Sequence, residues 1–83
     1  MTFKEKFDSE HIWHRKVLIL ELFHNSMRLR NVRWSQRDTA SAFGVSLGLV
    51  NEDLLLARLV KEDSGIDKCK TRKEALIVMR GSH

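Results

Sequence analysis

Basic side chains form two clusters in this sequence, and their spacing fits one chemistry, the neutralisation of phosphate groups. Residues 28–37 carry four arginines and no acid, and residues 68–73 carry four basic residues and no acid. The segment 44–67 between them carries two basic and five acidic residues, so its net charge is −3. Such clusters can bind a polyanion such as DNA, but they are equally typical of solvated surfaces. The clusters are Arg28, Arg30, Arg33 and Arg37, and Lys68, Lys70, Arg72 and Lys73.

Histidine and cysteine offer little further chemistry. His11 and His14 lie about one helical turn apart and His24 follows, but no cysteine or carboxylate is placed to complete a metal site with them. Cys69 is the single cysteine, which excludes an internal disulfide and fits a reducing compartment. The sequence has no Gly-rich phosphate loop and no nucleophile motif. We therefore expect no metal, no cofactor, no small-molecule substrate and no enzymatic activity.

The composition predicts one small all-α domain. The chain has 83 residues, 42% of them hydrophobic, with no proline and four glycines. This length allows one domain, and the scarcity of proline and glycine favours helices. No apolar run is long enough to span a membrane, and residues 1–10 lack the apolar stretch of a secretory signal. We expect a cytoplasmic protein without a membrane partner.

A long first helix is predicted from Asp8 to Arg30. Asp8 can cap its start, and Phe7 can pack on Ile12 across the first turn. Apolar residues recur at three- and four-residue spacing and cover much of the helix circumference, which predicts a central helix, a partner surface, or both. We expect His24 and Trp13 on its core face, and Trp34 beyond its end in the core as well.

Two shorter helices follow the break at residues 31–34. Ser35 is the predicted cap of a helix that ends at Phe43, and Gly44 is a typical residue for the end of a helix. Ser46 is the predicted cap of the next helix, which ends near Lys61. A three- to four-residue turn therefore joins the two helices.

The last predicted helix begins at a capping box formed by Thr71 and Glu74 and includes residues 75–79. Residues 62–70 before it are expected to be a loop. Together the predicted elements make an all-α fold of about four helices, in a single domain over residues 1–80. Residues 81–83 fit either native sequence or the remnant of an affinity tag, and the abrupt end of the helix fits the N-terminal domain of a longer protein.

The segment SQRDTASAFGVSLGLVNEDLLLARLV resembles the helix-turn-helix of bacterial DNA-binding proteins. Ala40 is small where the two helices cross, and Gly44 supplies the left-handed turn. The wedge between the helices is filled by Phe43, Val45 and Val50. The resemblance covers about 25 residues and implies a central helix-turn-helix.

One position departs from the usual pattern of this motif. An aliphatic residue is expected three positions after Val50, but Asp53 stands there and Leu54 follows. The order V-x-x-D-L is similar to that of winged-helix repressors of the DeoR type, but no strand pattern for a wing follows Lys61. The longer run, with the capped helix after it, is more similar to modules of phages, plasmids and other mobile DNA, including ParB-like partition proteins. This resemblance places the protein in the bacterial cytoplasm or nucleoid.

The resemblance implies which residues contact DNA. The second helix of the motif would enter the major groove by its start, where Asn51 could pair with adenine and Glu52 with a cytosine amino group. The implied base contacts are Ser46, Leu47, Gly48, Asn51 and Glu52. The implied phosphate contacts are Arg28, Arg30, Arg33, Ser35, Gln36, Arg37, Lys70, Arg72 and Lys73. Ordinary solvated helix surfaces remain the alternative for these residues.

The expected function is sequence-specific binding of duplex DNA by a homodimer, in replication, partition or transcriptional control. A dimer would use the wide apolar face of the first helix or the final helix. The alternative is a helical protein–protein interaction or oligomerisation module without affinity for DNA. The acidic residues Glu52 and Asp53 and the acidic stretch 62–67 favour that alternative.

Overall fold

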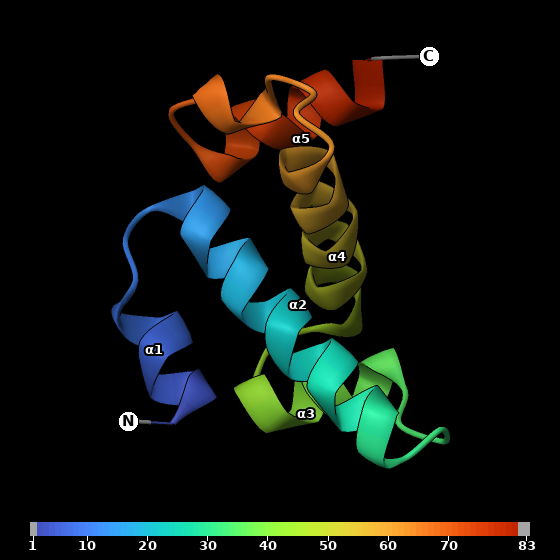
Figure 1. The fold of residues 1–83 in the computed structure, drawn as a ribbon. Coiled ribbons are helices and arrows are strands. Elements are labelled where there is room, and N and C mark those ends of the chain that lie inside the picture. The colour runs from blue at the N-terminus through green and yellow to red at the C-terminus, as the bar shows by residue number, and fades with distance from the viewer. Residues whose placement is uncertain (1, 82–83) are drawn as a thin grey trace.

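Every regular element of residues 2–81, which the computed structural model describes, is a helix (Figure 1). The predicted all-α class is confirmed, with five α-helices in place of about four. None of these helices has the length and apolar character needed to cross a membrane. The elements are α1 (Phe3–Ser9), α2 (Trp13–Arg30), α3 (Gln36–Phe43), α4 (Leu47–Lys61), a 3-10 turn (Ile66–Lys68) and α5 (Arg72–Gly81).

The predicted start of the first helix is wrong, because the chain forms two helices there. Thr2 caps α1 and forms a capping box with Glu5, so helix begins before Asp8 and not at it. Asp8 instead lies inside α1 and pairs with Lys4 at 2.6 Å. The chain then leaves the helix, and the Glu10 carboxylate accepts hydrogen bonds from the next two backbone N–H groups, both at 3.1 Å. A second capping signal upstream of Asp8 and this local side-chain bond explain the break.

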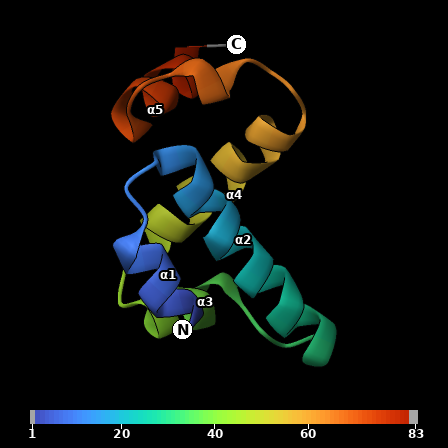
Figure 2. The ribbon, with the colours of Figure 1, turned by 60° about the vertical axis from the view of Figure 1, so that its left-hand side comes forward.

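Phe7 therefore packs elsewhere than predicted. It lies against Phe43 of α3, with 5.0 Å between the ring centroids, while Ile12 stays 39% exposed. The two views of the ribbon show α1 beside α3, at the end of the molecule away from α5 (Figures 1 and 2). This contact joins the start of the chain to the middle of the fold.

The core consists of two clusters, and α2 contributes to both. The upper core lies under α5 and consists of Trp13, Val17, Leu56, Ala57, Ile66, Ala75 and Leu76. The lower core lies between α1, α3 and the start of α4 and consists of Phe7, Leu20, Ala40, Phe43 and Val50. The expected central place of this helix is confirmed, since α2 passes diagonally across α4 between the two clusters (Figure 1).

The boundaries of α3 and α4 agree with those expected from their caps. Ser35 and Asp38 form a capping box at the start of α3, and Ser46 Oγ accepts from Leu49 N at the start of α4. Gly44 ends α3 with φ of 67°, in the left-handed region where glycine is favoured. Local capping chemistry thus fixes a three-residue turn, 44–46, between the two helices.

The start of α5 differs in one detail from the predicted capping box. Thr71 Oγ1 accepts from Glu74 N at 3.1 Å as expected, but the Glu74 carboxylate accepts from Lys70 N instead of Thr71 N. The helix also extends to Gly81, beyond the predicted residues. Of the segment 81–83 that fits a tag remnant, residues 82 and 83 lie outside the described residues.

Candidate nucleic-acid interface

The start of α4 presents small and uncharged side chains to solvent. Ser46, Gly48 and Asn51 are exposed, and Leu47 is 42% exposed. A Cβ added at Gly48 would meet no atom within 4 Å, so the space above this residue is open. Leu49 is half-buried against the lower core and is less accessible than its neighbours. Four of the five predicted base-contacting residues therefore share one accessible helix start.

The fifth predicted base contact, Glu52, is engaged inside the molecule. Its carboxylate pairs with the Arg72 guanidinium at 3.1 Å and with the Arg80 guanidinium at 2.6 Å. Both partners come from α5, and the side chain is 28% exposed. A cytosine amino group would have to compete with these two ion pairs for the same oxygens.

Of the three residues predicted to bind phosphate at the start of α3, only Arg37 is both exposed and free of side-chain ion pairs and hydrogen bonds within the described residues. The Ser35 hydroxyl is already used by the cap, because it accepts from Asp38 N at 3.2 Å and donates to the Asp38 carboxylate at 3.0 Å. Gln36 is half-buried. Arg37 is exposed and has no ion pair or side-chain hydrogen bond among the described residues. Arg37 is thus the available cation at this helix start.

The other three arginines of the first basic cluster are equally unpaired. Arg28, Arg30 and Arg33 are exposed, and within residues 2–81 none of their side chains pairs with a carboxylate. They lie at the end of α2 and in the loop before α3, at a corner of the molecule far from α5 (Figures 1 and 2). We call Arg28, Arg30, Arg33 and Arg37 the arginine cluster. Its positive charge is not neutralised by neighbouring acids.

The second basic cluster is different, because its arginine belongs to the fold. Arg72 Nε donates to Asp53 Oδ1 at 2.8 Å, and the Asp53 side chain is only 2% exposed. Burial raises the pKa of Asp53, and the hydrogen bond and charge of Arg72 offset only part of that shift. Lys68, Lys70 and Lys73 are exposed and carry no ion pair among the residues described. In this cluster the three lysines, and not Arg72, are therefore available to contact phosphates.

The position of Asp53 explains the departure from the aliphatic pattern. A carboxylate at a buried position of α4 needs a cation, and Arg72 supplies it from α5. Sequence reasoning noticed the unusual residue but missed its partner. The signal was present, since an aspartate inside an apolar helix pattern indicates either a functional group or a buried pair.

A polar network of His24, Trp34 and Thr39 joins the three segments that carry the arginine cluster. Thr39 is fully buried, and its hydroxyl lies 2.7 Å from His24 Nδ1 and accepts from Trp34 Nε1 at 2.8 Å. Burial lowers the pKa of His24, and the charge of Arg28 lowers it further. His24 and Trp13 lie in the core as expected, whereas Trp34 is only partly buried. The network joins α2, the loop and α3, and sequence reasoning missed it because His24 and Thr39 are 15 positions apart and meet only when α2 packs against α3.

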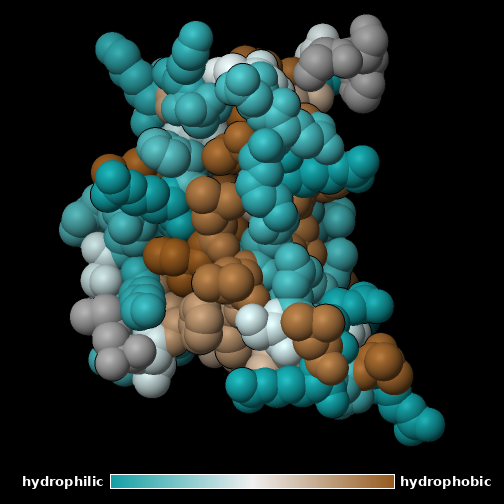
Figure 3. Space-filling model, viewed as in Figure 1, coloured by the Kyte–Doolittle hydropathy of each residue, from teal (hydrophilic) through white to brown (hydrophobic). Residues whose placement is uncertain are grey.

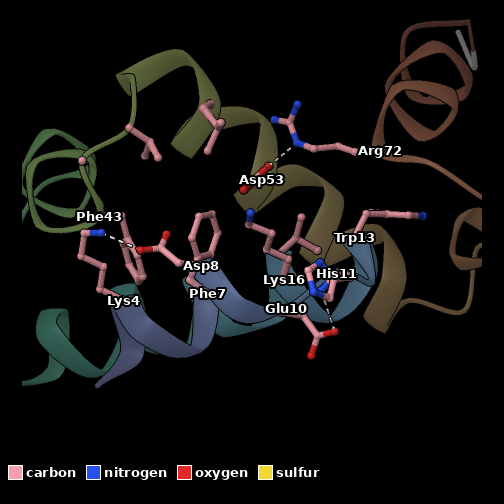
Figure 4. Close-up of a pocket in the computed structure, with 14 residues that line it drawn as sticks. Lys4, Phe7, Asp8, Glu10, His11, Trp13, Lys16, Phe43, Asp53 and Arg72 are labelled. Atoms are coloured by element: carbon pink, nitrogen blue, oxygen red, sulfur yellow. Dashed lines mark hydrogen bonds and ion pairs between the residues drawn. The ribbon is translucent and has the colours of Figure 1, made fainter. Parts of the chain in front are cut away.

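A cleft of about 580 Å³ separates the α1–α2 connection from α4 (Figure 4). Its charged groups mostly bind one another: Lys4 pairs with Asp8, and Arg72 with Asp53. The Lys16 ammonium lies 4.4 Å from the centre of the Phe7 ring and is directed toward Asp53. These two ion pairs and the ring contact of Lys16 are formed within the chain and contribute to the fold.

The described residues contain no group of three or more histidine, cysteine, aspartate or glutamate side chains that could hold a metal ion. Comparison with protein-family models, with curated proteins and with solved structures found no match to this chain. The function must therefore be argued from the residues themselves.

Proposed function

We propose that this protein binds duplex DNA through α3 and α4, acting as a helix-turn-helix. One observation carries the proposal: the start of α4 offers an uncharged, accessible surface, and the arginine cluster that precedes it in the chain has no carboxylate partner among the described residues. A groove-reading helix needs side chains that can approach base edges, and the flanking cations supply affinity for phosphates. Both requirements are met by residues that lie on adjacent helices.

The structure supports a narrower set of contacts than the sequence did. Leu47, Gly48 and Asn51 are the accessible base readers, since Asn51 can make two hydrogen bonds to adenine and Leu47 can touch a thymine methyl. Arg28, Arg30, Arg33 and Arg37 hold the phosphates, with Lys70 and Lys73 as a weaker second set. Glu52 and Arg72 serve the fold through their mutual ion pair.

The biological role we propose is replication, partition or transcriptional control of a mobile element or a bacterial genome. A homodimer would place two α4 helices about 34 Å apart on an inverted repeat. Leu22 on α2 and Ile77 on α5, which are 58% and 61% exposed, are available for such a dimer.

The test is a fluorescence-anisotropy titration with random-sequence duplex and with genomic fragments, at two salt concentrations. We expect micromolar or tighter binding that weakens steeply with salt. Arg37→Ala should weaken binding to all sequences and flatten the salt dependence, whereas Asn51→Ala should relax the preference at one base position. Arg15→Ala is the matched control, because Arg15 is exposed on α2 far from this surface.

A second candidate is a protein–protein interaction module without affinity for DNA. The observation that favours it is the absence of any arginine or lysine from the first turns of α4, whose basic residues, Arg58 and Lys61, lie in its last turn. If the wild-type protein binds no duplex even at low salt, this candidate replaces the first. The exposed start of α4 would then be the surface to test against protein partners.

A further inference from the structure

The two most exposed large hydrophobic residues of the described chain lie within the arginine cluster. Leu29 at the end of α2 is 89% exposed and Val32 in the following loop is 84% exposed. The other exposed large hydrophobics range from 39% to 61%. Figure 3 shows brown side chains projecting beside teal ones at the lower right, where α2 ends. We call residues 28–33 the α2–α3 tip.

Hydrogen bonds hold this tip in one conformation. Asn31 N donates to Met27 O at 2.9 Å, Trp34 N donates to Asn31 O at 2.9 Å, and Arg33 N donates to Asn31 Oδ1 at 3.0 Å. Trp34 then closes the loop onto the body through its bond to Thr39 and its edge contact with Phe23, whose ring centroid is 6.0 Å away. Leu29 is therefore presented by the last turn of α2, and Val32 by a loop with its own hydrogen bonds.

The charge around these two residues selects the kind of partner. Arg28, Arg30 and Arg33 flank them, and the nearest acids along the chain are occupied: Glu21 pairs with Lys61, and Asp38 caps α3. Apolar side chains surrounded by unpaired arginines are complementary to a partner whose surface carries negative charges and whose interior is apolar. Stacked base pairs below a phosphate backbone have this chemistry, and proteins insert apolar wedges with flanking arginines into the minor groove.

The length of α3 places the tip at a suitable distance from α4. The eight residues of α3 separate the tip from the turn before α4, and at about 1.5 Å per residue they span about 12 Å. The major groove is also about 12 Å wide. With the start of α4 in the major groove, a tip about 12 Å away would meet the phosphate strand at the groove edge and the minor groove beyond it.

From these observations we infer that the α2–α3 tip is a second DNA-contacting element, in which Leu29 and Val32 insert into the minor groove next to the α4 site. The arginines bind the flanking phosphates, and the inserted side chains partly unstack a base step and bend the duplex. This inference rests on the proposed binding of duplex DNA and adds to it a bend and a preference for easily deformed flanking steps, such as TA.

The experiment measures bending and binding together. Duplexes of about 30 bp, selected by the protein from a random pool, carry a fluorophore at each end, and energy transfer reports the end-to-end distance. We expect wild-type protein to increase the transfer. The double variant Leu29→Ser, Val32→Ser should abolish that increase and lower the affinity by about tenfold, while the base preference at the α4 site is unchanged.

The control is the double variant Ile12→Ser, Leu55→Ser, which removes two exposed hydrophobic side chains outside the tip and outside the residues proposed for DNA contact and for the dimer. It should bend DNA like the wild type. Thermal unfolding of both double variants shows whether the fold is retained, which we expect because all four residues are exposed.

Three outcomes would overturn the inference, and they are distinguishable. Binding of duplex without any change in energy transfer would overturn the tip contact and leave the proposed function intact. Absence of duplex binding by the wild type would overturn both. If the tip variant bends DNA normally but loses self-association in sedimentation velocity, or loses sedimentation with anionic vesicles, the tip serves a second copy or a membrane instead.

Discussion

The two basic clusters carry the same formal charge but differ in their ion pairs. Both carry four basic residues and no acid. In the arginine cluster of residues 28–37, all four arginines are exposed and unpaired among the described residues. In the cluster of residues 68–73, Arg72 bridges Asp53 and Glu52, and Arg80 further along α5 adds a second ion pair to Glu52.

This difference shows that the net charge of a sequence segment does not tell how many of its basic side chains remain unpaired after folding. The acidic segment 44–67 separates the clusters in sequence, but the fold brings its Glu52 and Asp53 to only one of them, because α5 packs on α4. The other cluster lies at the far end of α2, in the loop that follows and at the start of α3, where none of its arginines pairs with a carboxylate of the described residues. Arg72 thus contributes to the fold, whereas the charge of the arginine cluster is exposed to solvent.

The largest expected effect comes from breaking the paired cluster. Arg72→Ala should lower the free energy of unfolding by about 3–5 kcal/mol, because it leaves the buried Asp53 carboxylate without its cation. Denaturant unfolding measures the change. Lys73→Ala is the control, since Lys73 is exposed and unpaired among the residues described, and should change stability by no more than about 0.5 kcal/mol.

A double variant sharpens this prediction. Asp53→Leu with Arg72→Met replaces the pair by apolar side chains and restores the aliphatic residue typical of the motif. Most of the stability lost in Arg72→Ala should return, because no buried charge remains. An Arg72→Ala variant as stable as the wild type would show that Asp53 does not depend on this partner.

Neutralising the arginine cluster should instead affect binding and leave stability unchanged. Replacing Arg28, Arg30, Arg33 and Arg37 by glutamine should weaken binding to random-sequence duplex roughly a hundredfold at low salt. The slope of log affinity against log salt should become shallower by about 3.6, which is about 0.9 for each phosphate contact. The matched variant replaces Lys68, Lys70 and Lys73 by glutamine. A larger loss in that variant would reverse the comparison between the clusters.

The unneutralised charge of the arginine cluster should also be visible in the pH dependence of stability. The folded-state pKa of His24 is lowered from 6.5, first by burial and then by Arg28, so the unfolded chain binds a proton first as pH falls. The stability that His24 contributes is full above about pH 6.5 and is lost as pH falls from there through the lowered folded pKa. His24→Gln should reduce this loss, and His11→Gln, at an exposed position, should not.

Arg28→Gln tests the same point from the arginine side. Without this charge the folded-state pKa of His24 rises toward its unfolded value, so the loss of stability at low pH should become smaller. An unchanged pH profile in Arg28→Gln would mean that solvent screens the arginine cluster from the interior.

The smallest expected effect is that of Gly48→Ala at the start of α4, which should change stability and DNA affinity in opposite directions. Gly48→Ala should raise the free energy of unfolding by up to about 1 kcal/mol, because alanine favours the helix and its methyl group meets open space. If DNA approaches this residue closely, affinity should fall at the same time. Asn25→Ala, at an exposed position on α2, is the control that should leave affinity unchanged. Equal affinity in Gly48→Ala and wild type would remove Gly48 from the proposed contact surface.

The sequence by itself determined the elements whose signals are local. Ser35, Gly44 and Ser46 fixed the boundaries of α3 and α4, because caps and left-handed turns depend on residues within one helical turn. The apolar spacing in α2 likewise predicted its central position. The wrong helix start at Asp8 came from two competing capping signals within the same ten residues, where Thr2 and Glu5 decide the outcome.

Only the tertiary structure decided which charges are available and which hydrophobic side chains are left outside. Asp53 and Arg72 are 19 positions apart, and His24 and Thr39 are 15 apart. Leu20 and Leu29 lie nine residues apart and therefore on opposite faces of α2. Leu20 is fully buried and Leu29 is 89% exposed, because the other helices pack on the face that carries Leu20. Ion pairing and burial depend on which helices pack together, and that information is not local in the chain.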